Sequence, residues 1–273
     1  MKVYNNSVST STKLLGAQGN LLVIPTFNCA PQIVGLMDSL EPVANHWDGI
    51  WFVDNGSTDG TTDQILNHLK IRHRFPNETR VLLNSENIGL GGTHKVSIEK
   101  AISSDYKTLT IFHGDHQANI QEALTALELI KIHKNSFLMG SRFSKTSKLV
   151  GYSRIRTLFN QCMNIIYSVV LSRRVYDLGS GLNIFPISPL KDIEFNKLPN
   201  DLTFNIEFLK WLVLNKKDII WFPITWVETD QISNVKITKQ VLKTFKLLFL
   251  PYGRMGSAID PGHYQTEVKP DVD

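Results

Sequence analysis

The sequence is poor in cysteine, with only Cys29 and Cys162 among its 273 residues. Two cysteines without a C-x-x-C pair cannot form a disulfide framework, which favours a reducing compartment. No apolar run approaches the roughly 18 residues of a membrane span. Residues 1–13 are polar and lack the apolar core of a secretory signal. We therefore expect a cytoplasmic protein, with peripheral attachment to the inner face of a membrane left open.

The sequence also has little excess of charge of one sign. Lys and Arg number 29 against 25 Asp and Glu, which gives a net charge of +4. Without a long basic block or interleaved basic and aromatic residues, nucleic acid is not an expected partner. A mild positive charge suits an anionic small molecule or a membrane surface. The hydrophobic content of 42% and the length are typical of one large soluble domain.

Short apolar runs alternate with amphipathic segments through the first half of the chain. The predicted strands are 21–27, 50–55, 80–84, 109–113 and 136–143, and the predicted helices are 32–40, 61–70, 94–102 and 119–133. Continuous apolar runs between helices predict an α/β fold, with a mostly parallel sheet covered by helices on both faces. Such sheets bind ligands at the carboxyl ends of their strands.

The second half is less regular but still alternates. The predicted elements are helices at 153–174, 202–215 and 236–250 and strands at 180–186 and 219–226. We expect a flexible segment over 1–19, one domain over 20–236, a C-terminal amphipathic helix over 237–255 and a flexible tail over 256–273. The basic amphipathic helices either lie on a membrane surface or pack on their own domain.

Three motifs follow predicted strands. VDNGSTDGT (53–61) is either a well-built turn or a site where Asp54 accepts hydrogen bonds from a nucleobase or ribose. NIGLGGTHK (87–95) places glycines before a helix whose N-terminus favours anions, with Lys95 in its first turn. GSRF (140–143) ends a strand with Arg142, whose planar fork suits diphosphate oxygens or a neighbouring carboxylate.

IFHGDHQ (111–117) is the least ordinary stretch, because a single aspartate follows a buried strand between two histidines. The stretch predicts a metal site, a helix-capping turn or an altered form of a known motif. A histidine at a strand end is more often a hydrogen-bonded turn residue than a metal ligand. We expect His116 to point away from any site.

These motifs, taken in order, resemble the family 2 glycosyltransferases of the GT-A fold. VIPTFN, VDNGSTDGT, N-x-G-x-G-G, a D-x-Q strand end and GSRF are similar above all to the dolichyl-phosphate mannosyltransferase-like branch, over about 21–236. The resemblance implies an inverting transfer from a UDP- or GDP-sugar to a polyprenyl phosphate or to a glycan or lipid-linked acceptor. It places the protein in cell-surface polysaccharide or glycoconjugate synthesis.

The resemblance also implies site residues. Those expected to bind the nucleotide sugar are Pro25, Thr26, Asn28, Asp54, Gly91, Lys95, Asp115 and Arg142. The family's D-x-D motif binds Mg²⁺ or Mn²⁺; here its first aspartate is His113 and its second is Asp115. The implied metal ligands are Asp115, His113 and Gln117, and an imidazole among them favours Mn²⁺.

The remaining implied roles concern the acceptor and catalysis. Besides Asp115, the predicted catalytic residues are Glu207 and Asp177, with Glu207 the first candidate for general base toward a hydroxyl acceptor and Asp201 a further one. Arg156, Ser180 and Lys236 are expected to hold the acceptor or its phosphate. Positions 29, 183 and 230 depart from the pattern, which weakens a lipid phosphate as acceptor.

Two other functions compete with this assignment. A non-catalytic homologue that binds a nucleotide sugar or a partner would explain the incomplete D-x-D motif. A sugar-phosphate nucleotidyltransferase is disfavoured, because it calls for a glycine-rich basic loop after the first strand and PTFNCAPQ (25–32) offers none.

Overall fold

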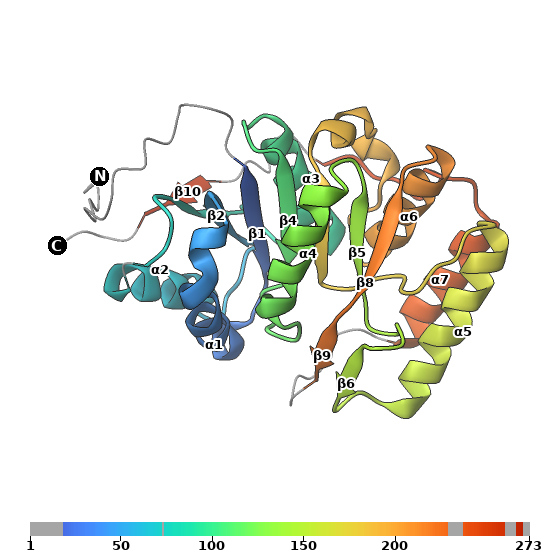
Figure 1. Cartoon of the computed structure of the whole chain (residues 1–273), viewed down its shortest axis with the longest axis horizontal. Helices are drawn as coiled ribbons and strands as arrows, with labels where there is room; N and C mark the ends of the chain where they lie inside the picture. The colour runs from blue at the N-terminus through green and yellow to red at the C-terminus, as the bar shows by residue number, and fades with distance from the viewer. Residues whose placement is uncertain (1–18, 73, 229–236, 260–265, 270–273) are drawn as a thin grey trace.

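An eight-stranded sheet forms the centre of the computed structural model, which describes residues 19–72, 74–228, 237–259 and 266–269 (Figure 1). The strand order is β10-β3-β2-β1-β4-β7-β5-β8. The strands are β1 (Asn20–Thr26), β2 (Gly49–Asp54), β3 (Glu78–Leu83), β4 (Thr108–Phe112), β5 (Phe137–Ser141), β7 (Leu182–Pro186), β8 (Ile219–Pro223) and β10 (Thr266–Val268). A small second sheet pairs β6 (Lys148–Val150) with β9 (Thr225–Val227).

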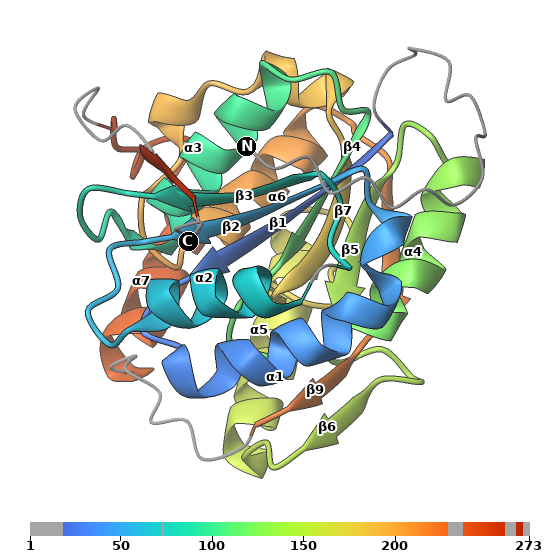
Figure 2. The ribbon, with the colours of Figure 1, turned by 90° about the vertical axis from the view of Figure 1, so that its left-hand side faces the viewer.

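Helices cover both faces of the large sheet, as the apolar runs predicted. They are α1 (Ala30–Leu40), α2 (Thr61–Ile71), α3 (Gly89–Ile102), α4 (Ile120–Ile132), α5 (Arg154–Val170), α6 (Phe204–Leu214) and α7 (Ile237–Phe249). Figure 2 shows α1 and α2 on one side of the sheet and α3 on the other. The expected α/β architecture with a mostly parallel sheet is confirmed.

Successive residues of β1 explain how two cores form. Leu22 and Ile24 pack in the cluster under α1, α2 and α4, whereas Leu21 and Val23 pack in the cluster under α3 and α6. Side chains of a strand alternate between faces, so a strand buried on both sides reads as a continuous apolar run. A third cluster joins α5, α6 and α7, where Tyr167 donates a hydrogen bond to the carbonyl of Thr244 at 2.7 Å.

Strand β7 runs antiparallel between β4 and β5, which the apolar runs did not predict. Its first residue, Leu182, pairs with Phe112, the last residue of β4. Strand β7 therefore begins at the edge where the parallel strands end. This direction brings the 176–181 segment to the carboxyl ends of β4 and β5.

Part of the expected flexible tail over 256–273 is described by the structure, and these residues contact the rest of the fold. β10 pairs antiparallel with β3, and the carbonyl of Ser257 accepts a hydrogen bond from Lys95 Nζ. The described residues of this range therefore have backbone hydrogen-bond partners elsewhere in the fold. None of the helices in the described ranges combines the length and apolarity needed to cross a bilayer.

Candidate functional site

The carboxyl ends of β1 and β4 are clamped together at the edge where a ligand is expected. Gly114 donates its backbone N–H to the carbonyl of Pro25 at 2.9 Å. A Cβ on Gly114 would lie 2.5 Å from Thr26 Cγ2, so only glycine fits there. The 113–117 loop is thereby held beside Pro25 and Thr26, two of the predicted nucleotide-binding residues.

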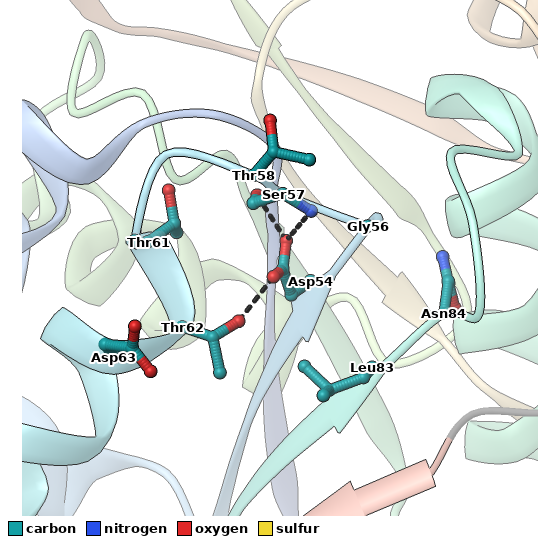
Figure 3. A pocket seen from close by; sticks show the side chains of 10 residues that line it. Asp54, Gly56, Ser57, Thr58, Thr61, Thr62, Asp63, Leu83 and Asn84 are labelled. Atoms are coloured by element: carbon teal, nitrogen blue, oxygen red, sulfur yellow. Dashed lines mark hydrogen bonds between the residues drawn. The ribbon is translucent and has the colours of Figure 1, made fainter.

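Asp54 ends β2 inside a pocket of about 380 Å³ (Figure 3). Its Oδ1 accepts hydrogen bonds from Ser57, through N–H at 3.2 Å and Oγ at 2.5 Å, and its Oδ2 accepts one from Thr62 Oγ1. The lining residues are Asp54, Gly56, Ser57, Thr58, Gly60, Thr61, Thr62, Asp63, Leu83 and Asn84. The turn fixes the carboxylate, and Oδ2 keeps capacity to accept one more hydrogen bond.

Asn28 joins the end of β1 to the same turn. Its Oδ1 accepts the N–H of Thr58 at 2.9 Å, and its own N–H donates to Ser57 Oγ at 2.9 Å. Asn28 has a φ of 46°, a left-handed conformation that asparagine adopts more readily than most residues. The turn reading of VDNGSTDGT therefore holds, and the turn also shapes the pocket.

Three asparagine side chains, which the sequence motifs did not single out, connect the loops after β2 and β3. Asn84 Nδ2 donates to Asn55 Oδ1 at 3.1 Å, and Asn55 Nδ2 donates to Asn87 Oδ1 at 2.8 Å. Asn84 Oδ1 is buried without a hydrogen-bond partner, and Asn84 lines the Asp54 pocket. A polar atom left unpaired beside a pocket is a candidate ligand contact.

The glycine-rich turn at the start of α3 is packed against protein. Gly92 N–H donates to the carbonyl of Asn200 at 3.0 Å. A Cβ on Gly91 would lie 2.3 Å from the Pro199 carbonyl oxygen. The close backbone approach that glycine permits is thus used by the 199–201 segment. Gly91 stays a prediction as a nucleotide-binding residue, but it has no open face toward a ligand.

Lys95 lies in the same helix and is fully buried. Its Nζ donates to the carbonyls of Leu198 at 2.8 Å and Ser257 at 2.6 Å. Burial lowers the pKa of Lys95 to about 8. These contacts direct the ammonium to backbone carbonyls, so the described structure gives Lys95 a structural role rather than a phosphate contact.

Asp115 follows β4 at the position of the second aspartate of D-x-D. Burial raises its pKa, against the opposing influence of His113, the N–H of Gln117 and Arg142. The N–H of Gln117 donates to Asp115 Oδ1 at 3.3 Å. A carboxylate in a desolvated position gains from a nearby cation, so Asp115 suits a divalent ion, and Gln117 stays a predicted ligand.

The two histidines of this loop face different parts of the molecule. His116 Nε2 lies 3.4 Å from Ser39 Oγ of α1, and its ring lies against Gly35, away from the predicted site. His113 Nε2 lies 3.2 Å from the Nε2 of His94, a residue that the sequence motifs did not single out. Only Nδ1 of His113 is thus available to a ligand.

Arg142 and Asp177 were predicted in separate roles, and the structure pairs them. Asp177 accepts two side-chain hydrogen bonds from Arg142, each of 2.8 Å. Burial lowers the pKa of Arg142, but the charge and hydrogen bonds of Asp177 outweigh it and raise the pKa overall. The guanidinium lies over the rings of Phe143 and Trp226, both at 5.2 Å, and Tyr152 at 5.9 Å. Asp177 therefore positions Arg142, which retains the N–H groups of Nη1.

Glu207, the predicted general base, lies in the interior of α6 with both oxygens engaged. Its Oε1 pairs with Lys210 Nζ at 2.8 Å, and its Oε2 accepts the N–H of Gly253 at 2.9 Å. Lys210 also donates to the carbonyl of Leu250 at 3.1 Å. Glu207 thus holds the chain that follows α7, and its fully buried carboxylate offers no face to an acceptor.

The predicted acceptor residues are spread along the 148–228 region. Ser180 is buried and donates within its own loop to the Leu182 carbonyl at 3.2 Å. Arg156 pairs with Glu228 at 2.5 Å and lies over the Tyr152 ring at 4.7 Å. Lys236 lies outside the described residues.

One further group of potential metal ligands lies elsewhere in the described chain. Asp38, Glu41 and His68 place ligand atoms within 4.8 Å of one another. Arg72 lies 3.8 Å from Asp38 and 3.5 Å from Glu41, so it already balances these carboxylates. Asp38 and Glu41 lie at the C-terminal end of α1, and His68 lies in the last turn of α2.

Comparison with known proteins gives a consistent result. The model of the family described as Glycosyl transferase family 2 matches residues 21–194. No curated protein matches the chain in sequence.

Solved structures share the fold at low sequence identity. Mannosyl-3-phosphoglycerate synthase from Rubrobacter xylanophilus superposes with a TM-score of 0.60 at 15% identity, over 90% of this chain and 78% of that one. S. aureus TarS 1-349 in complex with UDP-GlcNAc gives 0.56 at 19% identity, over 84% and 65%. Glucosyl-3-phosphoglycerate synthase from Mycobacterium tuberculosis in complex with phosphoglyceric acid gives 0.60 at 14% identity, over 85% and 80%.

Proposed function

The chain belongs to glycosyl transferase family 2, and on this premise we propose that it transfers a sugar, with inversion, from a UDP- or GDP-sugar to an acceptor that carries a phosphate. One observation supports this most. Asp54, Asp115 and Arg142 lie at the carboxyl ends of three parallel strands of one sheet, and Asp54 lines a pocket large enough for a nucleoside.

In this proposal the nucleoside occupies the Asp54 pocket and the diphosphate lies between Asp115 and Arg142. Asp54 and Asn84 supply acceptors for base or ribose N–H and O–H groups. Arg142, held by Asp177, directs its remaining N–H groups at the phosphate oxygens. Fixed donors at the point where leaving-group charge develops lower the barrier without reorganisation.

A divalent cation, Mn²⁺ or Mg²⁺, would be held by Asp115 with Gln117. When bound, it neutralises charge on the leaving diphosphate. The carboxylate of Asp115 would hold this cation at the end of β4, next to the proposed diphosphate position.

The state of the predicted bases favours an acceptor that is already an anion. Asp177 is bound to Arg142, and Glu207 is bound to Lys210 and Gly253. Asp201 accepts hydrogen bonds from Thr203 and Lys243. A hydroxyl acceptor needs a general base, whereas a phosphate does not. Polyprenyl phosphate is the acceptor we propose, and a glycan hydroxyl is the alternative that the acceptor assay separates.

The outer faces of α5 and α7 support access to a lipid-linked acceptor. On α5 the exposed apolar residues recur at helical spacing; they are Ile155, Leu158, Ile165 and Val169, with exposed fractions of 83%, 67%, 65% and 75%. On α7 the exposed ones are Leu242, Phe245 and Phe249. Arg173, Arg174, Lys243 and Lys246 supply positive charge around them. An apolar stripe with basic flanks suits an anionic bilayer surface, so we propose peripheral attachment there.

Binding of the donor is tested by thermal shift with a panel of UDP- and GDP-sugars, with and without Mn²⁺. We expect one nucleotide to raise the melting temperature in a saturable, Mn²⁺-dependent way, and Asp115→Asn to abolish the Mn²⁺ dependence. The matched control is Asp105→Asn in an exposed loop, which should behave as the parent. Absence of any stabilisation at millimolar nucleotide would refute the proposal.

The acceptor is tested by turnover with polyprenyl phosphate and with free oligosaccharides, using the donor found above. Product formed on polyprenyl phosphate alone supports our assignment. Product formed on a glycan hydroxyl supports the alternative acceptor, and binding without turnover indicates a non-catalytic homologue.

Attachment to a membrane surface is tested with vesicles of phosphatidylcholine and phosphatidylglycerol. Leu158→Glu with Ile165→Glu should release the protein, whereas Ile132→Glu, an exposed apolar site on α4, should not.

A further inference from the structure

The rings of His94 and His113 form a buried pair beside the predicted diphosphate position. Their Nε2 atoms are 3.2 Å apart, and the ring centroids are 5.3 Å apart at an interplanar angle of 49°. A hydrogen bond between two ring nitrogens contains one proton, so one ring must donate and the other accept.

The second nitrogen of His94 decides the direction of this bond. His94 is 1% exposed, and its Nδ1 is buried without a hydrogen-bond partner. Its ring meets Phe204 edge-on at 5.1 Å, which provides no acceptor. A proton on Nδ1 would be a buried, unpaired N–H, and orphaned N–H groups are rarer in proteins than under-used acceptors. The proton of His94 therefore belongs on Nε2, which donates to His113.

It follows that His113 accepts through Nε2 and carries its own proton on Nδ1. His113 is only partly buried, and no described residue takes a hydrogen bond from this Nδ1. The start of β7 limits the other side of the ring, since a Cβ on Gly181 would lie 2.9 Å from His113 Nδ1. The ring is thus held between His94 and Gly181 with one N–H left to offer.

We propose that His94 is a positioning residue that fixes His113 as the Nδ1–H tautomer, so that His113 donates a hydrogen bond to a diphosphate oxygen of the donor instead of ligating the metal. This inference rests on the proposed function for the identity of the ligand, but not for the tautomer. It revises the predicted metal set, because a protonated Nδ1 has no lone pair for a cation.

The pair also accounts for the altered D-x-D motif. An aspartate at position 113 would offer only acceptors and would need a cation to meet a phosphate. A histidine in this tautomer offers a donor, and together with Arg142 it meets phosphate charge directly. Cation binding then falls to Asp115 and its loop. The residue at 94 matters because without its Nε2–H the tautomer of His113 is no longer fixed.

The tautomer is tested by long-range ¹H–¹⁵N NMR correlation on the ¹⁵N-labelled full chain, without metal or nucleotide. The His113 signals are those lost in His113→Gln. We expect the Nδ1–H pattern in the parent, its loss in His94→Phe, and its retention in His94→Gln, whose amide N–H still donates to His113. If His94→Phe fails to fold, His94→Gln against the parent still reports the pattern. An Nε2–H pattern in the parent, or an unchanged pattern in His94→Phe, overturns the inference.

The role of the N–H is tested by titrating UDP and GDP into the same proteins in EDTA. We expect about tenfold weaker binding in His94→Phe and parent-like binding in His94→Gln, while His133→Gln, at the end of α4, serves as control. Equal affinity in the parent and His94→Phe overturns the diphosphate contact. If the parent binds a nucleotide with Mn²⁺ but neither nucleotide in EDTA, the diphosphate contact of His113 fails and the proposed function stands, whereas no binding under either condition refutes the proposed function. The NMR result for the tautomer of His113 does not depend on nucleotide binding or on the diphosphate contact.

Discussion

The carboxylate of Asp177 binds the guanidinium of Arg142 side-on, with Nε to Oδ2 and Nη2 to Oδ1 both at 2.8 Å. The same Oδ2 accepts the backbone N–H of Arg142 at 2.9 Å. Side-chain exposure is 13% for Arg142 and 1% for Asp177. Such a bidentate pair fixes the direction of the remaining guanidinium N–H groups. The antiparallel course of β7 is what brings the 176–181 segment to Arg142.

Asp177→Asn should therefore destabilise the protein as well as weaken nucleotide binding. Removing one charge of a buried pair leaves the other uncompensated, at a cost of about 3 kcal/mol in the free energy of unfolding. The measurement is urea unfolding of both proteins. Asp192→Asn, which breaks the surface pair with Lys217, is the control and should cost less than about 0.5 kcal/mol. Equal stability of Asp177→Asn and the parent would show that the pair is not formed in solution.

The two cysteines should differ sharply in reactivity. Cys29 is buried, and burial raises the pKa of its thiol to about 12. Cys162 is exposed on α5. Because the thiolate is the reactive form, iodoacetamide at pH 8 should modify Cys162 rapidly and Cys29 only after unfolding. Peptide mass analysis after timed quenching measures both sites, and Cys162→Ser should leave the native protein unlabelled. Labelling of native Cys29 at a rate similar to that of Cys162 would contradict the burial.

The lowered pKa of Lys95 leads us to expect that the stability of the protein depends on pH. Burial lowers its pKa to about 8 in the folded state, whereas the unfolded chain keeps the ordinary value of 10.5. Between these values the unfolded chain binds a proton that the folded protein has released, so stability attributable to this group rises with pH. The gain is up to about 1.4 kcal/mol for each pH unit in that window.

The measurement compares urea unfolding of the parent and Lys95→Met at pH 7 and pH 9.5. The difference between the two proteins should shift toward the parent at the higher pH, and the comparison removes the influence of other titrating groups. Lys246→Met, an exposed lysine on α7, should show no such shift. A pH-independent difference for Lys95→Met would mean that its pKa is not lowered.

The sequence predicted the positions of helices and strands better than it predicted the contacts of the charged residues. Apolar periodicity and turn residues are local, so nearly every helix and strand of the first half was expected within a few positions. The direction of β7 and the pairing of β10 with β3 depend on strand partners distant in sequence, and local pattern carries no information about them.

The site residues also divide into those that local sequence predicts and those whose partners are distant in the sequence. Asp54, Asp115 and Arg142 were predicted as site residues because strand ends mark the ligand edge of a parallel sheet, and they stay predictions. Lys95 was misleading, since the carbonyls that bind it belong to Leu198 and Ser257, distant in the sequence. His94 was missed because its partner, His113, becomes a neighbour only when α3 packs beside β4. A histidine within a glycine-rich turn, with another at a strand end, was the signal available.

For Glu207, a catalytic role and a structural role predict different effects of substitution on kcat and on stability. Its carboxylate is fully buried, paired with Lys210 at 2.8 Å and bonded to the N–H of Gly253 at 2.9 Å. We expect Glu207→Gln to lower the free energy of unfolding by about 3 kcal/mol, because Lys210 loses its counter-charge in the interior. At a temperature where the variant is folded, kcat should stay within about tenfold of the parent.

The double variant Glu207→Gln with Lys210→Met sharpens the test. If the two residues stabilise the protein through each other, the loss in the double variant is smaller than the sum of the single losses, with a coupling of about 1 kcal/mol or more. A general base would behave in the opposite way. Its removal would lower kcat by about 10² to 10⁴ while leaving stability unchanged. Both quantities are measured on the parent, the two single variants and the double variant. A fall in kcat without a fall in stability would return Glu207 to the catalytic site, and with it the hydroxyl acceptor that needs a base.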